Sequence, residues 1–305
     1  MIGHQLTLLR RELWEHPAIY VAPLAIAALV LLGLLTGQVT VSAFGEAVDF
    51  GIVIAQNSSD LQRAAAITGV LLIVTTLFAL GALIVMAFYS LDALYAERKD
   101  KSILFWRSLP ITDAETVLSK LLTALLVIPL VTLLIAIATH LAILVMTSVW
   151  VMIQGGDASH LVWSSAPLAD AWISSLVFAV AMPLWLSPFV GWFLLVSALT
   201  KRAPLLMAFM PLLVVPLLEK MSTGTYFFYN AIFVRSFLPP IARFDDISWD
   251  KSELPTLPNG DSFSVLEQLD IAGFLTSPSL WAGMIVCALF VTAAIYVRRY
   301  RDESY

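Results

Sequence analysis

The chain has little charge and almost no cysteine. Charged residues make up 13% of its 305 residues, hydrophobic residues make up 60%, and the mean hydropathy is +0.88. Because a soluble domain usually carries about 25% charged residues, this composition indicates an integral membrane protein. The single cysteine, Cys287, excludes an intrachain disulfide. It lies in an apolar run, where we expect it to act as a small packing residue.

Motifs for nucleotide, metal and nucleophile chemistry are also missing. No Gly-x-x-x-x-Gly-Lys-Ser/Thr loop occurs, so any dependence on ATP must come from a partner. There is no His-Glu-x-x-His and no Gly-x-Ser-x-Gly, and the histidines are scattered at His4, His16, His140 and His160. The sequence therefore supports no catalytic residue, no metal site and no cofactor bound by this chain. The net charge of −5 gives no reason to expect a nucleic-acid partner.

What the sequence does contain is a set of long apolar runs. A bilayer core of about 30 Å needs about 20 apolar helical residues. We predict an all-α membrane protein with a single domain over 1–305 and six spans, at 17–37, 67–91, 121–153, 171–199, 204–218 and 280–297. The third run would form about 50 Å of helix, so it should tilt or project from the membrane. The fifth is short and can span only by recruiting nearby residues or by local thinning.

The first run has two interpretations, a retained helix or a cleaved signal peptide. Arg10 and Arg11 precede it, and Val41, Ser42 and Ala43 loosely resemble a cleavage site. The apolar stretch is longer than a typical signal core of about 7–15 residues. We therefore expect a retained first helix.

The segment 4–16 before this run has an amphipathic pattern. Leu9, Leu13 and Trp14 can share a helix face with Leu6, and Arg10 lies elsewhere. This pattern favours a helix lying in the membrane interface. The alternative is a merely polar leader.

The basic residues are unevenly distributed over the predicted loops. Six spans put both termini on one side, and that side holds twelve of the 17 Lys and Arg residues: Arg10, Arg11, Arg98, Lys99, Lys101, Arg107, Lys120, Lys201, Arg202, Arg298, Arg299 and Arg301. By the positive-inside rule, this side is cytoplasmic. We therefore expect a multi-pass protein of the cytoplasmic (inner) membrane with both termini in the cytoplasm.

The predicted external segment 222–279 is longer than a turn requires. Residues 226–244 are rich in aromatics and either re-enter the membrane or lie on its surface. If they re-enter it, irregular backbone inside the membrane must be shielded by protein. Residues 245–261 are acidic and resemble an exposed loop. A short amphipathic helix is expected at 264–275.

Ionisable residues and prolines mark the remaining irregularities within the spans. His140 in the third span is a candidate for transport chemistry or a neutral residue hydrogen-bonded to a neighbouring helix, and we favour the second interpretation. Pro129, Pro183 and Pro188 favour kinks in the third and fourth spans. No Asp, Glu, Lys or Arg lies deep in these spans, which argues against a proton- or sodium-coupled carrier.

The most distinctive segment is a polar loop at 92–120 between the second and third spans. It reads YAERKDKSILFWRSLPITDAETVLSK from Tyr95 to Lys120. Its apolar cluster at 103–106 cannot pack on itself, and Thr112 or Asp113 can cap the helix that follows. Either the loop is solvated with its aromatics among the lipid headgroups, or it is a docking element for a cytoplasmic protein.

This loop resembles the cytoplasmic loop of ABC-2 type permeases, the membrane subunits of ATP-binding-cassette exporters. The resemblance lies in the run from Tyr95 to Pro110 and in Asp113, Thr116, Ser119 and Lys120. The end of the chain, from Ser277-Pro278-Ser279-Leu280-Trp281 to Arg298-Arg299-Tyr300-Arg301, is similar to the last helix and tail of that family.

The resemblance implies a pair of permeases, either a homodimer or a complex with a paralogue, bound to two separate ATPase subunits that hold ATP and Mg²⁺. A coupling helix would be formed by 97–109, with ATPase-coupling residues Glu97, Arg98, Ser102, Phe105, Trp106, Arg107 and Leu109. The connecting helix beside it would include Leu9, Arg10, Leu13 and Trp14. Residues 226–244 would re-enter the membrane from outside.

The expected function is therefore the translocation path of an ATP-driven exporter, coupled to hydrolysis by a partner. The chain alone would not be an enzyme. Two alternatives remain: an ATP-independent secondary carrier or channel, and a membrane scaffold that transports nothing. The sequence does not identify the transported substrate.

Overall fold

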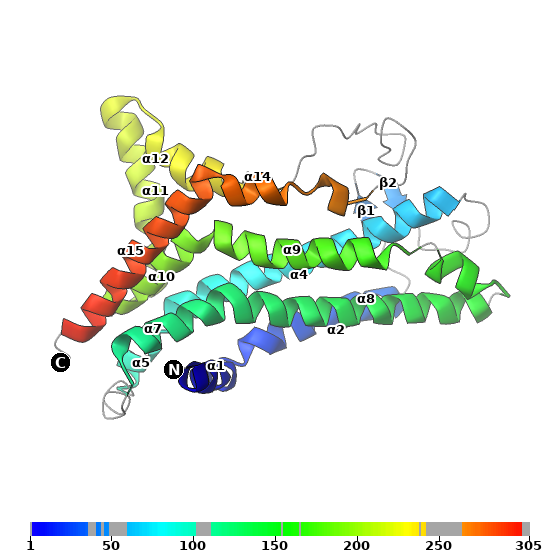
Figure 1. The fold of residues 1–305 in the computed structure, drawn as a ribbon, viewed down its shortest axis with the longest axis horizontal. Coiled ribbons are helices and arrows are strands. Elements are labelled where there is room, and N and C mark those ends of the chain that lie inside the picture. The colour runs from blue at the N-terminus through cyan, green and yellow to red at the C-terminus, as the bar shows by residue number, and fades with distance from the viewer. Residues whose placement is uncertain are drawn as a thin grey trace.

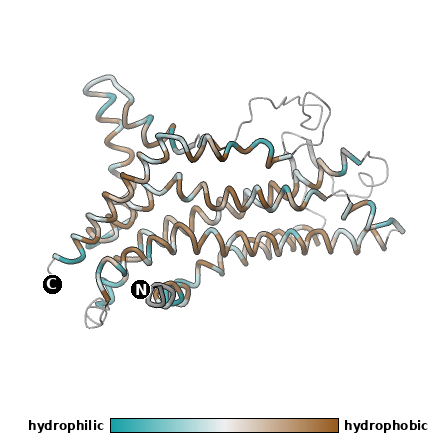
Figure 2. The backbone as a smooth tube through the Cα atoms, in the orientation of Figure 1, coloured by the Kyte–Doolittle hydropathy of each residue, from teal (hydrophilic) through white to brown (hydrophobic). Residues whose placement is uncertain are grey.

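The computed structural model describes residues 2–35, 41–43, 46–48, 60–101, 111–153, 155–164, 166–237, 239–241 and 264–300. Figure 1 shows a bundle of helices in which the N-terminal helix and the end of the last helix lie at the same end, called here the terminal end. Apolar residues run along the helices, and polar residues gather toward the two ends of the bundle (Figure 2). The described chain is therefore organised as a membrane-embedded bundle would be.

Helices account for nearly all of the described secondary structure. In the first half they are α1 (Ile2–Glu15), α2 (Ala18–Leu35), α4 (Asp60–Asp92), α5 (Tyr95–Lys99), α7 (Asp113–Leu122), the π-helical turn η1 (Thr123–Val127) and α8 (Ile128–Ile153). The second half contains η2 (Ser159–Trp163), α9 (Leu168–Trp185), α10 (Ser187–Leu199), α11 (Pro204–Thr223), α12 (Phe227–Tyr229), η3 (Asn230–Val234), α13 (Arg235–Phe237), η4 (Leu266–Gln268), α14 (Ile271–Thr276) and α15 (Pro278–Tyr300). The strands β1 (Val41–Ala43) and β2 (Glu46–Val48) form one short antiparallel pair.

The predicted set of six apolar helices able to cross a membrane is confirmed within the described residues. They are Ala18–Leu35, Arg63–Lys99, Asp113–Ile153, Leu168–Trp185, Pro204–Thr223 and Pro278–Tyr300. The helices α2, α4, α8 and α9 pack along one another over the length of the bundle (Figure 1). Several are longer than the apolar runs because their polar ends continue the helix beyond the apolar core.

The predicted fourth span, 171–199, is divided in the structure. α9 ends at Trp185 and α10 begins at Ser187, with Leu186 between them at φ −87° and ψ 4°. Pro188 lies in the first turn of α10, where its missing N–H costs nothing but disfavours a continuous helix through the preceding turn. The two halves therefore take different directions (Figure 1).

The third span is continuous from α7 into α8 but changes its hydrogen-bonding pattern on the way. The π-helical turn η1 lies directly before Pro129. A proline lacks the N–H that would bond back along the helix, and its ring collides with the preceding turn. A wider turn at that point absorbs the misfit, as π-bulges commonly do inside long helices.

The fifth span, α11, leaves the bundle and stands across the direction of α8 and α9 (Figure 1). It extends past the predicted end at Leu218 to Thr223, where Gly224 at φ 70° terminates it. The segment 227–237 then continues as α12, η3 and α13. Residues 242–263, which include the whole of the predicted acidic loop at 245–261, lie outside the described residues. The helix expected at 264–275 is a 3₁₀ turn, η4, followed by the short helix α14.

α10 and α15 approach each other closely at Gly191. A Cβ built on Gly191 would lie 3.0 Å from the carbonyl oxygen and 3.1 Å from the Cα of Cys287. Cys287 is buried in the apolar core at the terminal end of the bundle. The absence of a side chain at Gly191 is therefore what allows the two helices to approach.

We expect Gly191→Ala to lower the free energy of unfolding by about 1–3 kcal/mol, because backbone atoms cannot rotate away from an added methyl group. Thermal unfolding of the purified protein in detergent measures the effect as a fall in Tm. Gly69→Ala in α4 is the matched control, since its added Cβ would meet nothing within 4 Å. An equal fall in Tm for both variants would contradict the close approach of α10 and α15.

Candidate functional site

A buried cluster of charged side chains joins four helices at the terminal end of the bundle. Its members come from α1, α5, α7 and α15, and we call them the ion-pair cluster: Arg11, Glu12, Glu97, Asp113, Lys120 and Arg298. Three are basic and three are acidic, so the formal charges balance. Charges are rarely buried in proteins unless they are paired in this way.

Lys120 is the most deeply buried member. Its side chain is 0% exposed, and its Nζ lies 3.0 Å from Glu12 Oε1 and 3.0 Å from Glu97 Oε1. One ammonium group therefore joins the N-terminal helix α1 to α5, which begins the polar loop. The capping box between Thr112 and Glu115 fixes the start of the helix that carries Lys120.

Glu97 is the centre of the cluster. Besides Lys120, its carboxylate accepts from Arg298 Nη1 at 2.6 Å and from Arg11 Nη2 at 3.3 Å. Arg298 also donates from Nε to Asp113 Oδ1 at 2.9 Å. The side chain of Arg298 is 4% exposed, whereas Arg299 beside it is exposed. One guanidinium group thereby pairs the C-terminal end of α15 with carboxylates of α5 and α7.

A second set of contacts holds α5 from the other side. Ser197 Oγ, near the end of α10, accepts from the backbone N–H groups of Leu94 and Tyr95 at 3.0 and 2.9 Å. The Arg98 guanidinium donates to the carbonyl oxygens of Ser197 and Thr200, the latter at 2.7 Å. Consecutive residues of α5 therefore contact opposite sides of the bundle, Glu97 the ion-pair cluster and Arg98 the end of α10.

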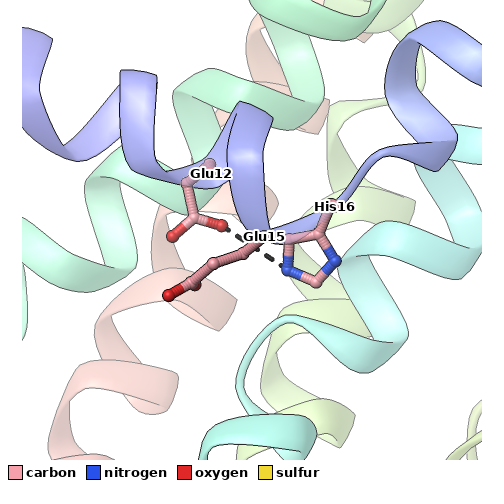
Figure 3. Close-up of side chains that lie close together, drawn as sticks. All are labelled: Glu12, Glu15 and His16. Carbon is pink, nitrogen blue, oxygen red and sulfur yellow. Dashed lines mark ion pairs between the residues drawn. The ribbon is translucent and has the colours of Figure 1, made fainter.

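Glu12, Glu15 and His16 lie close enough to suggest a metal site. Their potential ligand atoms are within 4.8 Å of one another, and Figure 3 shows the contact between Glu12 and His16. Glu12 Oε1 already accepts from Lys120, and Glu12 Oε2 accepts from the Tyr89 hydroxyl at 2.7 Å. Glu15 is paired with Arg11 at 2.7 Å. These bonds would have to break before a cation could bind. We therefore interpret the three side chains as ion-pairing groups, with Glu12 in the ion-pair cluster and Glu15 and His16 beside it.

Of the predicted coupling residues, the structure describes Glu97 and Arg98. Ser102, Phe105, Trp106, Arg107 and Leu109 lie outside the described residues. Glu97 is buried among other helices, so its position suits a role inside this chain. Lys101, the last described residue before that segment, has a left-handed φ of 57°, which ends α5.

The predicted residues of the N-terminal helix lie on several of its sides. Leu9 and Leu13 are partly buried, whereas Arg10 and Trp14 are exposed, Trp14 to 75%. The most buried side of α1 instead contains Leu8 and Glu12. The side facing the bundle therefore combines an apolar anchor with a carboxylate that pairs with Lys120.

Sequence reasoning missed Glu12 and Lys120 as members of a site, although a signal exists for Lys120. Val117, Ala124 and Ile128 recur at helical spacing and are all fully buried, and Lys120 shares their face. A lysine on a buried helical stripe needs an acidic partner. Nothing in the sequence pattern indicates which of the 22 acidic residues that partner is, because α1 and α7 are far apart along the chain.

His140 is buried near the middle of α8. Its Nε2 lies 3.4 Å from Thr75 Oγ1, which lies 3.4 Å from Ser175 Oγ. These contacts join α8 to α4 and α9. They agree with the interpretation of His140 as a hydrogen-bonded packing residue and show no ionisable partner for it.

His16 gives the ion-pair cluster a dependence on pH. Burial lowers the pKa of His16 below its ordinary value, although the nearby Glu12 opposes that shift. The unfolded chain therefore takes up this proton at a higher pH than the folded chain. The stability contributed by the neutral imidazole is present above about pH 6.5 and is lost as the pH falls through that value.

We expect the Tm of the wild type to fall more than that of His16→Gln as the pH is lowered from about 7.5 to about 5.5. Thermal unfolding of both proteins across that range measures the difference. Because both proteins contain the same acidic groups, the contribution of those groups to the pH dependence of Tm cancels in the comparison. Parallel curves would contradict a buried neutral His16.

Comparisons with protein-family models, with curated proteins and with solved structures find no match for this chain.

Proposed function

We propose that this chain is the membrane-spanning permease subunit of an ATP-driven exporter, an ABC-2 type permease. Two such chains, identical or paralogous, would form the path for a substrate, and two separate ATPase subunits would bind ATP and Mg²⁺. The terminal end would face the cytoplasm, because the loops assigned to that side hold twelve of the 17 basic residues. The six apolar helices supply the membrane-embedded part that this function requires.

The observation that carries the proposal is the position of Glu97. It begins the segment that resembles a coupling helix, and its carboxylate contacts Arg11 of α1, Lys120 of α7 and Arg298 of α15. A force applied to the loop after α5 would therefore reach three further helices at once. A loop that served only as a solvated connector would not need this buried attachment.

Charge pairing suits such a connection for a physical reason. Buried ion pairs add little net stability compared with apolar packing, but breaking one by removing a partner is costly. They therefore favour one defined arrangement of the helices that they join. The Arg98 contacts to α10 extend the same attachment to the divided fourth span.

Purification of the tagged full-length chain from its native membranes tests the proposal. We expect a stoichiometric nucleotide-binding partner to copurify and the complex to hydrolyse ATP. Efficient ATP-independent flux by the isolated chain in vesicles would instead support a carrier or channel. Substrate-stimulated ATPase activity of the reconstituted complex would exclude a scaffold that transports nothing.

A further inference from the structure

Arg235 lies where three helical elements meet, away from the ion-pair cluster. It begins α13, and its Nη1 and Nη2 donate to the carbonyl oxygens of Trp185 and Ser279 at 3.1 and 3.0 Å. Trp185 Nε1 donates back to the Arg235 carbonyl oxygen at 2.8 Å. The guanidinium carbon lies 4.2 Å from the centre of the Trp185 ring. The side chain is therefore held in one orientation.

Two features of the chain create this position. Trp185 is the last residue of α9, so the break before α10 frees carbonyl groups that a continuous helix would use. Gly283 of α15 leaves room for the guanidinium, because a Cβ there would overlap Arg235 Nη2. The division of the fourth span thus supplies carbonyl acceptors for Arg235, and the glycine in α15 supplies the space for its guanidinium.

The charge of Arg235 is not neutralised within the described residues. Its side chain contacts two neutral carbonyl groups and an aromatic ring, and no carboxylate of the described residues pairs with it. Arg298, by contrast, contacts two carboxylates. A guanidinium has five N–H donors, so donors remain on Arg235 after its two carbonyl contacts. The side chain is only half-buried, which leaves a path to them.

The surroundings of Arg235 suit an amphiphile. Tyr226, Phe227, Phe228 and Tyr229 precede it and are exposed, and tyrosine is a residue type that gathers at membrane interfaces. The neighbouring helix α11 also exposes apolar side chains along its length. α15 carries Ser279 and Arg298 near its two ends, and its 23 residues extend about 35 Å. Arg235 is therefore separated from the ion-pair cluster by about the thickness of a bilayer core.

From this geometry we propose that Arg235 binds the phosphate of an anionic lipid or a similar amphiphile. A guanidinium presents a planar pair of donors that matches a phosphate group, and its orientation here is fixed before the ligand arrives. The segment 222–279 holds seven acidic residues against three basic ones, which disfavours a freely dissolved anion. A lipid reaches the site from within the bilayer instead. The site does not depend on the proposed ATPase partner.

Lipid binding to the purified full-length chain tests this site. Native mass spectrometry with phosphatidylglycerol and with phosphatidylcholine should show preferential retention of the anionic lipid. We expect Arg235→Gln to weaken retention of phosphatidylglycerol at least about tenfold and to leave phosphatidylcholine unchanged. Lys220→Gln is the matched control. Lys220 is an exposed basic residue in the last turn of α11 and is not held by the Trp185 and Ser279 carbonyl groups that orient Arg235.

Equal retention of the two lipids by the wild type, or unchanged retention by Arg235→Gln, would overturn the proposal. An Arg235-dependent rise in Tm with inorganic phosphate alone would overturn the assignment to a lipid. If Arg235→Gln does not fold, Arg235→Lys keeps the charge but loses the planar pair of donors. That variant should bind phosphatidylglycerol less tightly than the wild type, and equal binding would argue against the site.

Discussion

Glu97→Ala is expected to destabilise the folded chain by about 3–5 kcal/mol, the typical cost of removing one partner from a buried ion pair. The carboxylate of Glu97 is shared by Arg11, Lys120 and Arg298, and its side chain is only 5% exposed. Its loss would remove one of the two carboxylates that Lys120 contacts and one carboxylate partner of Arg298, while the Lys120–Glu12 and Arg298–Asp113 pairs would persist. Thermal unfolding in detergent should therefore show one of the largest falls in Tm of any single substitution outside the apolar core.

Asp100→Ala is the matched control for Glu97→Ala. Asp100 follows α5, carries the same charge and is exposed, so its removal should change stability by no more than about 0.5 kcal/mol.

A double-mutant cycle with Lys120→Met sharpens the test. The double variant Glu97→Ala with Lys120→Met should lose less stability than the sum of the losses of Glu97→Ala and Lys120→Met, because it removes both charges. Additive losses would show that the two side chains do not interact.

Phe105→Ala combined with Trp106→Ala is expected to detach the proposed ATPase from this chain. Both residues lie outside the described residues, so this prediction rests on the sequence and on the resemblance. Truncating one aromatic hot spot at an interface costs about 2 kcal/mol or more, and two such costs do not simply add. Binding of the ATPase should therefore weaken by roughly 30-fold or more, measured by copurification and by the ATPase activity of the complex.

Two controls separate docking from folding in that experiment. Tyr296→Ala removes another exposed aromatic, from α15, without changing the loop, and should leave ATPase binding intact. Phe105→Leu with Trp106→Phe keeps apolar bulk in the loop and should retain part of the binding. An unchanged complex with unchanged ATPase activity in the alanine double variant would argue against the loop as a docking element.

The two predictions probe different parts of the proposed coupling. The Glu97 variants test whether the attachment inside the chain exists, and they need no partner. The Phe105 and Trp106 variants test the surface that a partner would contact. A variant that folds but no longer binds the ATPase would have lost the docking surface of the loop. A variant that binds the ATPase but no longer responds to it would have lost the attachment inside the chain.

The class of the protein and the number of apolar helices could be read from the sequence. Apolar length is a local property, because a run of about 20 such residues is long enough to cross a bilayer whatever surrounds it. The start of α7 was equally readable, since Thr112 and Glu115 form a capping box within one turn. The tendency of Pro188 to interrupt the fourth span was also visible, although the sequence did not show that α9 and α10 would separate there.

The pairing of the charged side chains could not be read from the sequence and is set by tertiary packing. Glu12, Glu97, Lys120 and Arg298 look like ordinary residues of a polar leader, a loop, a helix start and a basic tail. Their pairing depends on how α1, α5, α7 and α15 converge, which no local pattern encodes. The same holds for Arg235, because its carbonyl partners become available only where α9 ends beside α15. The apolar length of each span is thus a property of the local sequence, whereas the pairing of the buried charges depends on how helices distant in the sequence pack together.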